Sequence, residues 1–204
     1  GKINGIIKVL AEQTKMYNYD GNIVSGSHLV FENKWIRVEN SKQAKLINYD
    51  ANNILHCLIT EKNFILTDNA TYADYQETNN NNVNNITQKK IAKHLNKGPY
   101  ISNDDDLNHQ YYWGFGGSTK IDNINIKNIK IGDIIQQKKV LGIVKLSTND
   151  IKIFNYKGIV VSGSQLVCEE DLWIRVHQSK YAHEVKNNEE YIYHLIISGN
   201  KLKI

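Results

Sequence analysis

The chain repeats itself, and this repeat limits its fold more than any other feature of the sequence. The stretch VSGSHLV at Val24–Val30 returns as VSGSQLV at Val161–Val167. Over Gly21–Val30 and Gly158–Val167, seven of ten positions are identical, and the similarity continues on both sides with one inserted residue. A spacing of about 137 residues is too long for a solenoid repeat and indicates two copies of a domain.

The two copies contain different parts of one complete unit. The first has a body that continues into a tail, TDNATYADYQE at Thr67–Glu77, whereas the second begins with an additional front segment, Tyr111–Lys139. We therefore expect a first copy at 1–77, an asparagine-rich linker at 78–110 and a second copy at 111–204. Low complexity in the linker is typical of a flexible loop.

Short β-branched and aromatic segments, broken by Gly, Asn or Asp, predict an all-β fold. Because strict alternation is patchy, we expect short, curved antiparallel strands with bulges. NYDGN at Asn18–Asn22 and NYKG at Asn155–Gly158 predict turns in which glycine takes a positive φ. The one helix that the sequence predicts is ITQKKIAKHLNKG at Ile86–Gly98, inside the linker. The segments expected as strands are IIKVL, KMYNY, NIVSG, HLVFE, KWIRVE, HCLIT and FILTD.

Composition argues against several functional classes. A chain of 204 residues with 41% hydrophobic residues can bury a core of its own. Its lysines are scattered and its only arginines are Arg37 and Arg175, which argues against a nucleic-acid groove. There is no apolar run of about 18 residues and no signal-peptide pattern, so we expect no membrane partner. These features suit a reducing cytoplasm or a virion.

Cofactor and metal motifs are also missing from the sequence, so we expect neither. Cys57 and Cys168 lie far apart and form no CxxC pair. The acidic stretch NDDDLNH at Asn103–His109 lacks the spacing and the glycine of a calcium loop. Cys168 matches Phe31 in the first copy, which favours core packing. We take His56 and His194 as equivalent residues that pack or form hydrogen bonds.

Three blocks in the second copy, GFGGSTKI, NIKIGDII and VLGIVKL, resemble the opening of Hint domains, the fold shared by inteins and hedgehog autoprocessing domains. Thr119 and the Ile131–Ile134 stretch match that pattern. Ser25–His28 is similar to the TxxH signature of the family, with Ser for Thr, and Ser162–Gln165 matches it without the His. The segment LHCLITEKNFILTDNATYADYQE resembles the close of Hint-like domains in viral and phage proteins. The resemblance implies two Hint-like bodies.

The chemistry implied by this resemblance is self-cleavage. A side-chain nucleophile attacks its own preceding carbonyl while an imidazole protonates the leaving amide nitrogen. The resemblance makes His28 the acid, lets Ser25 bind the same peptide, and puts Gly114 at the nucleophile position with Thr119 in the same block. Cys57 is a further nucleophile candidate, with core packing as the alternative.

The sequence departs from the Hint pattern where the chemistry would occur. Gly114 has no side chain, and Gln165, the counterpart of His28, cannot act as an acid. We therefore expect an autoprocessing module that is degenerate or inactive, with Ser162 and Gln165 as the second-copy counterparts of Ser25 and His28. An alternative is that Gly114 replaces a nucleophile by engineering. For His28, the sequence leaves both a structural and a functional role open.

Two classes of function follow. The first is the degenerate autoprocessing module, whose substrate is its own flanking polypeptide. The second is a structural or interaction β-domain of a viral particle or larger assembly, with homo-oligomer or virion partners. Because each copy lacks a part that the other has, we also expect strand exchange or a pseudo-twofold pair. The Asp74–Glu77 carboxylates are most simply explained as a strand-end cap.

Overall fold

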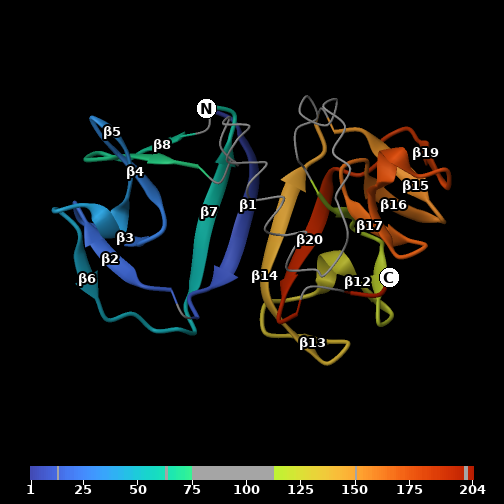
Figure 1. Cartoon of the computed structure of the whole chain (residues 1–204), viewed down its shortest axis with the longest axis horizontal. Coiled ribbons are helices and arrows are strands. Elements are labelled where there is room, and N and C mark those ends of the chain that lie inside the picture. The colour runs from blue at the N-terminus through green and yellow to red at the C-terminus, as the bar shows by residue number, and fades with distance from the viewer. Residues whose placement is uncertain (13, 63, 75–112, 150, 200–201) are drawn as a thin grey trace. The chain divides into compact units, whose positions relative to one another are not determined.

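In the computed structural model, the structure describes residues 1–12, 14–62, 64–74, 113–149, 151–199 and 202–204. The chain divides into two compact units, Gly1–Gln76 and Glu77–Ile204 (Figure 1). The described residues form strands, turns and 3-10 helices, so the prediction of an all-β fold is confirmed. No described helix is long and apolar enough to cross a membrane. The linker, its expected helix at 86–98 and the acidic stretch at 103–109 lie outside the described residues.

The first unit contains nine strands and one 3-10 helix among its described residues. These elements are β1 (Ile3–Leu10), β2 (Met16–Tyr19), β3 (Asn22–Ser25), β4 (Leu29–Glu32), β5 (Lys34–Arg37), η1 (Val38–Asn40), β6 (Lys45–Ile47), β7 (Ile54–Thr60), β8 (Phe64–Leu66) and β9 (Thr71–Ala73). All seven segments that the sequence predicts as strands lie in or overlap these strands.

After the front segment, the described part of the second unit repeats the element order of the first from β1 to β7 but has no counterparts of β8 and β9. Its elements are β10 (Phe115–Gly116), β11 (Lys120–Ile121), β12 (Ile124–Asn125), η3 (Ile126–Asn128), β13 (Ile134–Ile135), β14 (Lys138–Ser147), β15 (Ile153–Tyr156), β16 (Ile159–Ser162), β17 (Leu166–Glu169), β18 (Leu172–Arg175), η4 (Val176–Gln178), β19 (Ala182–Glu184) and β20 (Tyr191–Ile197).

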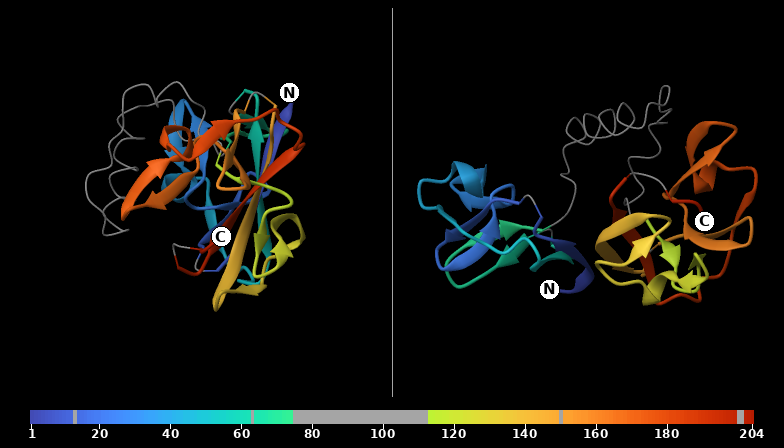
Figure 2. Two further views of the ribbon diagram at one scale, coloured as in Figure 1. Left: turned by 90° about the vertical axis from the view of Figure 1, so that its right-hand side faces the viewer. Right: turned by 90° about the horizontal axis from the view of Figure 1, so that it is seen from below.

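The two units share one pattern of strand pairing. β1 pairs with β7 and β14 pairs with β20, both antiparallel, and each pair lies side by side in every view (Figures 1 and 2). Ile3 lies opposite Thr60, and Val140 opposite Ile197, each 137 residues further on. Both ladders shift register two residues later, at a glycine. This is the bulge that the patchy alternation predicts.

The hairpins also correspond between the units. β2 pairs with β3 and β6, as β15 pairs with β16 and β19. Their tight turns contain Asp20 and Gly21 at φ 47° and 83°, and Lys157 and Gly158 at φ 51° and 86°. Positive φ at both central positions is the hairpin geometry that the turn sequences predict. The side chain of the preceding asparagine accepts a hydrogen bond from the amide of each glycine.

The inserted residue of the second copy lies in a turn. β4 and β5 are joined at Asn33, with φ 59°, whereas Glu170 and Asp171, with φ 48° and 66°, join β17 and β18. The extra residue sits in this turn, so it leaves the pairing of both hairpins unchanged. In a second length difference, counted between matching paired residues, the segment from β6 to β7 is one residue longer than the segment from β19 to β20. Matching residues in the β1–β7 and β14–β20 ladders are therefore again 137 positions apart.

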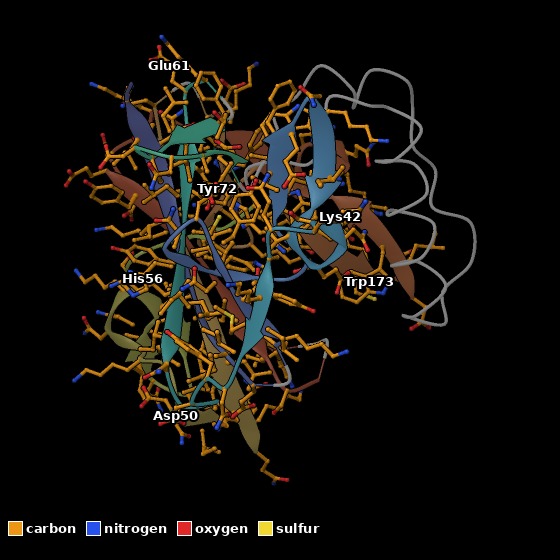
Figure 3. The ribbon with its side chains drawn as sticks, turned by 90° about the vertical axis from the view of Figure 1, so that its left-hand side faces the viewer. Lys42, Asp50, His56, Glu61, Tyr72 and Trp173 are labelled. Atoms are coloured by element: carbon orange, nitrogen blue, oxygen red, sulfur yellow. The ribbon has the colours of Figure 1, made fainter. Side chains whose placement is uncertain are left out.

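This second difference corrects the expected equivalence of His56 and His194. His56 lies opposite Lys8, and Tyr193 lies opposite Lys145, so His56 corresponds to Tyr193. His194 therefore corresponds to Cys57. A shift of one residue along a strand moves a side chain to the opposite face of the sheet. His56 is accordingly exposed on β7 (Figure 3), whereas Nδ1 of His194 is buried.

Each unit also pairs with its own additional segment. β10, from the front segment, pairs with β16 and β20, and thereby joins two ladders of the second unit into one sheet. β9, from the tail, pairs with β4 and β8 in the first unit. The front segment thus completes the second unit and the tail completes the first, so these two segments are not exchanged between the units.

Each unit contains apolar clusters of its own. In the first, Tyr19, Val30, Val38 and Tyr72 are buried together, and Tyr72 is labelled in Figure 3. In the second, isoleucines of the front segment fill the space over β14 and β20. This cluster contains Ile121, Ile126, Ile129, Ile135, Val140 and Leu195. A further cluster of Tyr156, Val161 and Val176 lies between β15, β16 and η4. The front segment is therefore part of the core of its unit.

Candidate functional site

The repeated Ser-Gly-Ser motif forms the same turn in both units. The amide of His28 donates to the carbonyl of Ser25, and the amide of Gln165 donates to that of Ser162. One residue further in, the carbonyls of Gly26 and Gly163 each accept an amide hydrogen bond from the 3-10 helix that follows. Four backbone hydrogen bonds of this motif recur at matching positions. The motif is therefore a structural turn, whatever the fourth side chain is.

The glycine of the motif is required by a close aromatic contact. A β-carbon on Gly26 would lie 2.6 Å from Cε2 of Tyr17, and one on Gly163 would lie 2.7 Å from Cε2 of Phe154. Both distances are well inside van der Waals contact, so no other residue fits without movement of the ring. The same aromatic contact in both units explains why the motif contains glycine in both.

In the second unit the front segment brings residue 114 against the motif. The amide of Gly114 donates to Oγ of Ser162 at 3.1 Å, and its carbonyl accepts from the amide of Ser162 at 2.9 Å. The amide nitrogen of Gly114 belongs to the 113–114 peptide bond, so the Ser162 hydroxyl binds the bond that a nucleophile at 114 would attack. Ser162 is fully buried.

Two features of this site bear on the self-cleavage chemistry that the resemblance implies. Gln165, only 8% exposed, donates from Nε2 to the carbonyl of Leu166 at 3.1 Å, and its Oε1 has no hydrogen-bond partner among the described residues. A carboxamide cannot protonate a leaving nitrogen. Gly114 also packs closely, since a β-carbon there would lie 3.0 Å from the carbonyl oxygen of Tyr193 in β20. A nucleophile at 114 therefore requires β20 to shift by a few tenths of an ångström.

A buried arginine lies against the side chain of Trp113, the residue before Gly114. Arg175 is 1% exposed and donates from Nη1 to the carbonyl of Ser164 at 2.6 Å. Its guanidinium carbon lies 5.3 Å from the ring centre of Trp113, which is cation–π distance. The Trp113 ring also meets His194 edge-on, with ring centres 6.4 Å apart. The side chain before Gly114 is thus held between a cation and a buried imidazole.

Burial lowers the pKa of His194, because the protonated ring loses its hydration there. Above the unfolded pKa of about 6.5, both folded and unfolded states are neutral and the stability is complete. As pH falls below that value, the unfolded chain takes up a proton that the folded unit resists, and stability is lost until the folded pKa is passed. We expect His194→Phe to reduce this acid loss in the second unit.

Hydrogen exchange, corrected for intrinsic rates, measures this effect as the opening free energy of β14 and β20 amides between pH 7.5 and 5. The β1 and β7 amides are the internal control, and their pH dependence should be unchanged by the substitution. An unaltered acid loss in β20 of His194→Phe would assign it to other groups.

His28 occupies the corresponding turn of the first unit. Its Nε2 lies 2.8 Å from the carbonyl oxygen of Ala73, which can only accept, so the ring donates from Nε2. Tyr72 packs edge-on against the imidazole, with ring centres 5.8 Å apart. Burial lowers the pKa of His28; the Ala73 hydrogen bond and the charge of Asp74 oppose that shift, and the charge of Arg37 adds to it. His28 is therefore a neutral side chain that ties the turn to the tail.

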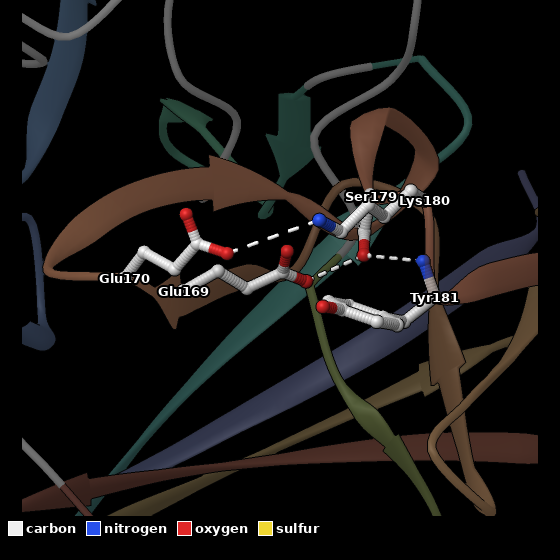
Figure 4. A network of polar contacts seen from close by, with 5 residues as sticks. All are labelled: Glu169, Glu170, Ser179, Lys180 and Tyr181. Carbon is white, nitrogen blue, oxygen red and sulfur yellow. Dashed lines mark hydrogen bonds and ion pairs between the residues drawn. The ribbon is translucent and has the colours of Figure 1, made fainter.

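A second polar network recurs in both units. Oγ of Ser179 donates to Glu169 and accepts from the amide of Tyr181, and Lys180 lies 3.8 Å from Glu170 (Figure 4). In the first unit Ser41 makes the matching bonds, donating to Glu32 and accepting from the amide of Gln43. The Tyr19 hydroxyl also donates to Glu32, and together the two donors lower the pKa of Glu32. This network stabilises the β4–β5 hairpin of the first unit and the matching β17–β18 hairpin of the second.

The remaining candidates lie on other elements. Thr119 is buried in a turn, where its amide donates to the carbonyl of Gly116. Cys57 lies on β7 opposite Ile7, in the first unit. Cys168 is exposed, so the expectation of core packing is wrong; its side chain faces outward from a two-stranded hairpin. Asp74 accepts from the amide and the hydroxyl of Thr60, at 2.6 and 2.9 Å, as expected for a strand-end cap.

Sequence reasoning missed the two arginines. Arg37 makes the same bond as Arg175, from Nη1 to the carbonyl of Ser27, but its side chain is exposed. A signal was present in the sequence, since the only two arginines of the chain occupy matching WIRV segments. The described residues contain no group of three or more His, Cys, Asp or Glu that could hold a metal ion.

No protein-family model, curated protein or solved structure matches the chain.

Proposed function

We propose that the chain is a degenerate Hint-type autoprocessing module, in which the second unit holds a peptide bond without cleaving it. The observation that carries this proposal is the hydrogen bond from the Gly114 amide to Oγ of Ser162. Ser162 occupies the position of the Hint Thr, and its bond reaches the nitrogen that would leave during self-cleavage. The proposal includes the origin of both units from one duplicated ancestor.

The matching pairing registers and turns support that common origin. A pseudo-twofold pairing of the units is a further part of the proposal, and small-angle scattering by the whole chain tests it. The alternative function, a non-catalytic β-domain of a viral particle or larger assembly, is favoured by the close packing of Gly114 against β20. Under that alternative the site exists only to fasten the front segment.

The double substitution Gly114→Cys and Gln165→His tests the autoprocessing ancestry. The introduced thiolate would attack the Trp113 carbonyl carbon, and the bond from that carbon to the nitrogen of residue 114 would break. The nitrogen takes a proton from the introduced imidazolium, which leaves a thioester at Trp113. An added thiol then exchanges with the thioester and releases residues 1–113. We expect slow, thiol-dependent cleavage at this bond, read by intact mass over days.

Matched controls separate chemistry from strain. Gly114→Ala with Gln165→His has the β-carbon but no nucleophile, and Gly114→Cys with Gln165→Asn has no imidazole; neither should be cleaved. The unsubstituted chain should keep its full mass, with or without thiol. If the double variant keeps the hydrogen-exchange protection of β14 and β20 and yet stays intact, the autoprocessing proposal fails and the structural alternative stands.

A further inference from the structure

The front segment occupies a place in the second unit that has an open counterpart in the first. β10 lies between β16 and β20, with Phe115 opposite both Val161 and Tyr193. The corresponding strands of the first unit are β3 and β7, and the corresponding residues are Val24 and His56. Within the described part of that unit, β3 pairs with β2 alone and β7 with β1 alone. Two sheet edges that bracket one strand in the second unit are therefore unpaired in the first, as far as its described residues show.

Burial at matching positions shows the same difference. Val140 is 0% exposed beneath the isoleucines of the front segment, whereas its counterpart Ile3 is 58% exposed. Ser162 is fully buried, and its counterpart Ser25 is only half-buried. The surface that the front segment covers in one unit is thus partly open to solvent in the other.

The arginine pair extends this comparison to recognition. Arg175 is buried beneath Trp113, whereas Arg37 makes the same carbonyl bond and remains exposed. The two arginines differ in exposure because Trp113, which covers Arg175, belongs to the front segment. Because a carbonyl already holds the exposed guanidinium of Arg37 in place, an aromatic ring can stack on it in a cation–π contact.

We propose that the first unit binds an extended peptide of the front-segment type by strand addition between β3 and β7. The peptide has an aromatic residue that covers Arg37, then Gly-Phe-Gly-Gly, and an isoleucine-rich continuation that covers Ile3. Main-chain hydrogen bonds to both edges provide affinity, as in other cases of strand addition.

Specificity comes from the glycine at position 114. A β-carbon on Gly114 would lie 3.0 Å from the backbone oxygen of Tyr193 in β20. The counterpart of Tyr193 on the β7 edge is His56, which has the same backbone carbonyl. A residue larger than glycine at this position cannot approach the edge as closely, so we expect the peptide to need glycine there. Binding does not depend on the cleavage chemistry proposed above, and the two proposals fail separately.

The probe is a synthetic peptide with the sequence Trp113–Lys139, added to the full chain. We expect saturable binding at one site, with new hydrogen-exchange protection of β3 and β7. Arg37→Ala should weaken binding roughly tenfold through loss of the cation–π contact. A control peptide with Phe115→Pro lacks the central amide donor and should not bind.

Three results would overturn the proposal. The first is no binding at about 1 mM peptide, which is the weakest affinity that strand addition should give. The second is altered exchange only in β16 and β20, which would mean that the peptide merely displaces β10 of the second unit. The third is a dimer of the chain that protects β3 and β7 without peptide, which would make a second copy the occupant.

Discussion

Replacing Arg175 with alanine is expected to destabilise the second unit by about 2–4 kcal/mol. The guanidinium is buried, donates to the carbonyl of Ser164 and supports the ring of Trp113. Its removal leaves a buried carbonyl without that donor and a void beneath the indole, and both cost free energy. The opening free energy of β14 and β20 amides measures the loss, and the fluorescence of Trp113 should change with it.

The matched control is Arg37→Ala in the first unit. Arg37 makes the same carbonyl bond but is exposed, so we expect a loss of about 1 kcal/mol or less, confined to β1 and β7. Equal losses from the two substitutions would show that the cover by Trp113 contributes nothing. A loss from Arg175→Ala that spreads equally to β1 and β7 would show that the units do not unfold independently.

The fold could be predicted largely because its signals are local. Alternation, turn glycines and short β-branched segments each depend on neighbouring residues, and they placed the strands and the Asp20–Gly21 and Lys157–Gly158 turns correctly. The equivalence of His56 with His194 failed because a length difference in one loop changes the register by one residue. No local sequence pattern reveals this one-residue difference, because the pairing with the neighbouring strand decides which face of the sheet a side chain occupies.

The site was predictable only in part, for a related reason. The repeat identified Ser162 and Gln165, but the bond from Gly114 to Ser162 joins residues far apart in the chain and depends on where β10 inserts. The burial of Arg175 depends on that insertion as well. Cys168 was misplaced because its hairpin pairs with no further strand among the described residues, which leaves one face in solvent.

Gly163→Ala is expected to destabilise the second unit by about 1–3 kcal/mol, although it adds a single methyl group. That methyl would lie 2.7 Å from the edge of the Phe154 ring, and the turn cannot move away without breaking the bonds of Gly163 to Lys152 and His177. Gly26→Ala should cost a similar amount in the first unit, where the Tyr17 ring lies 2.6 Å away. Urea unfolding of each variant, followed by hydrogen exchange in the two units separately, measures both losses.

Rescue by a smaller neighbour tests the cause. If the cost is overlap with the ring, Phe154→Leu should make room, and the double variant should be more stable than the sum of the two single losses implies. Tyr17→Leu is the corresponding partner for Gly26→Ala. Strictly additive losses would instead assign the cost to the backbone of the turn. In either unit, non-additive rescue would show that the motif recurs because an aromatic ring packs on its glycine, which is independent of whether His or Gln follows.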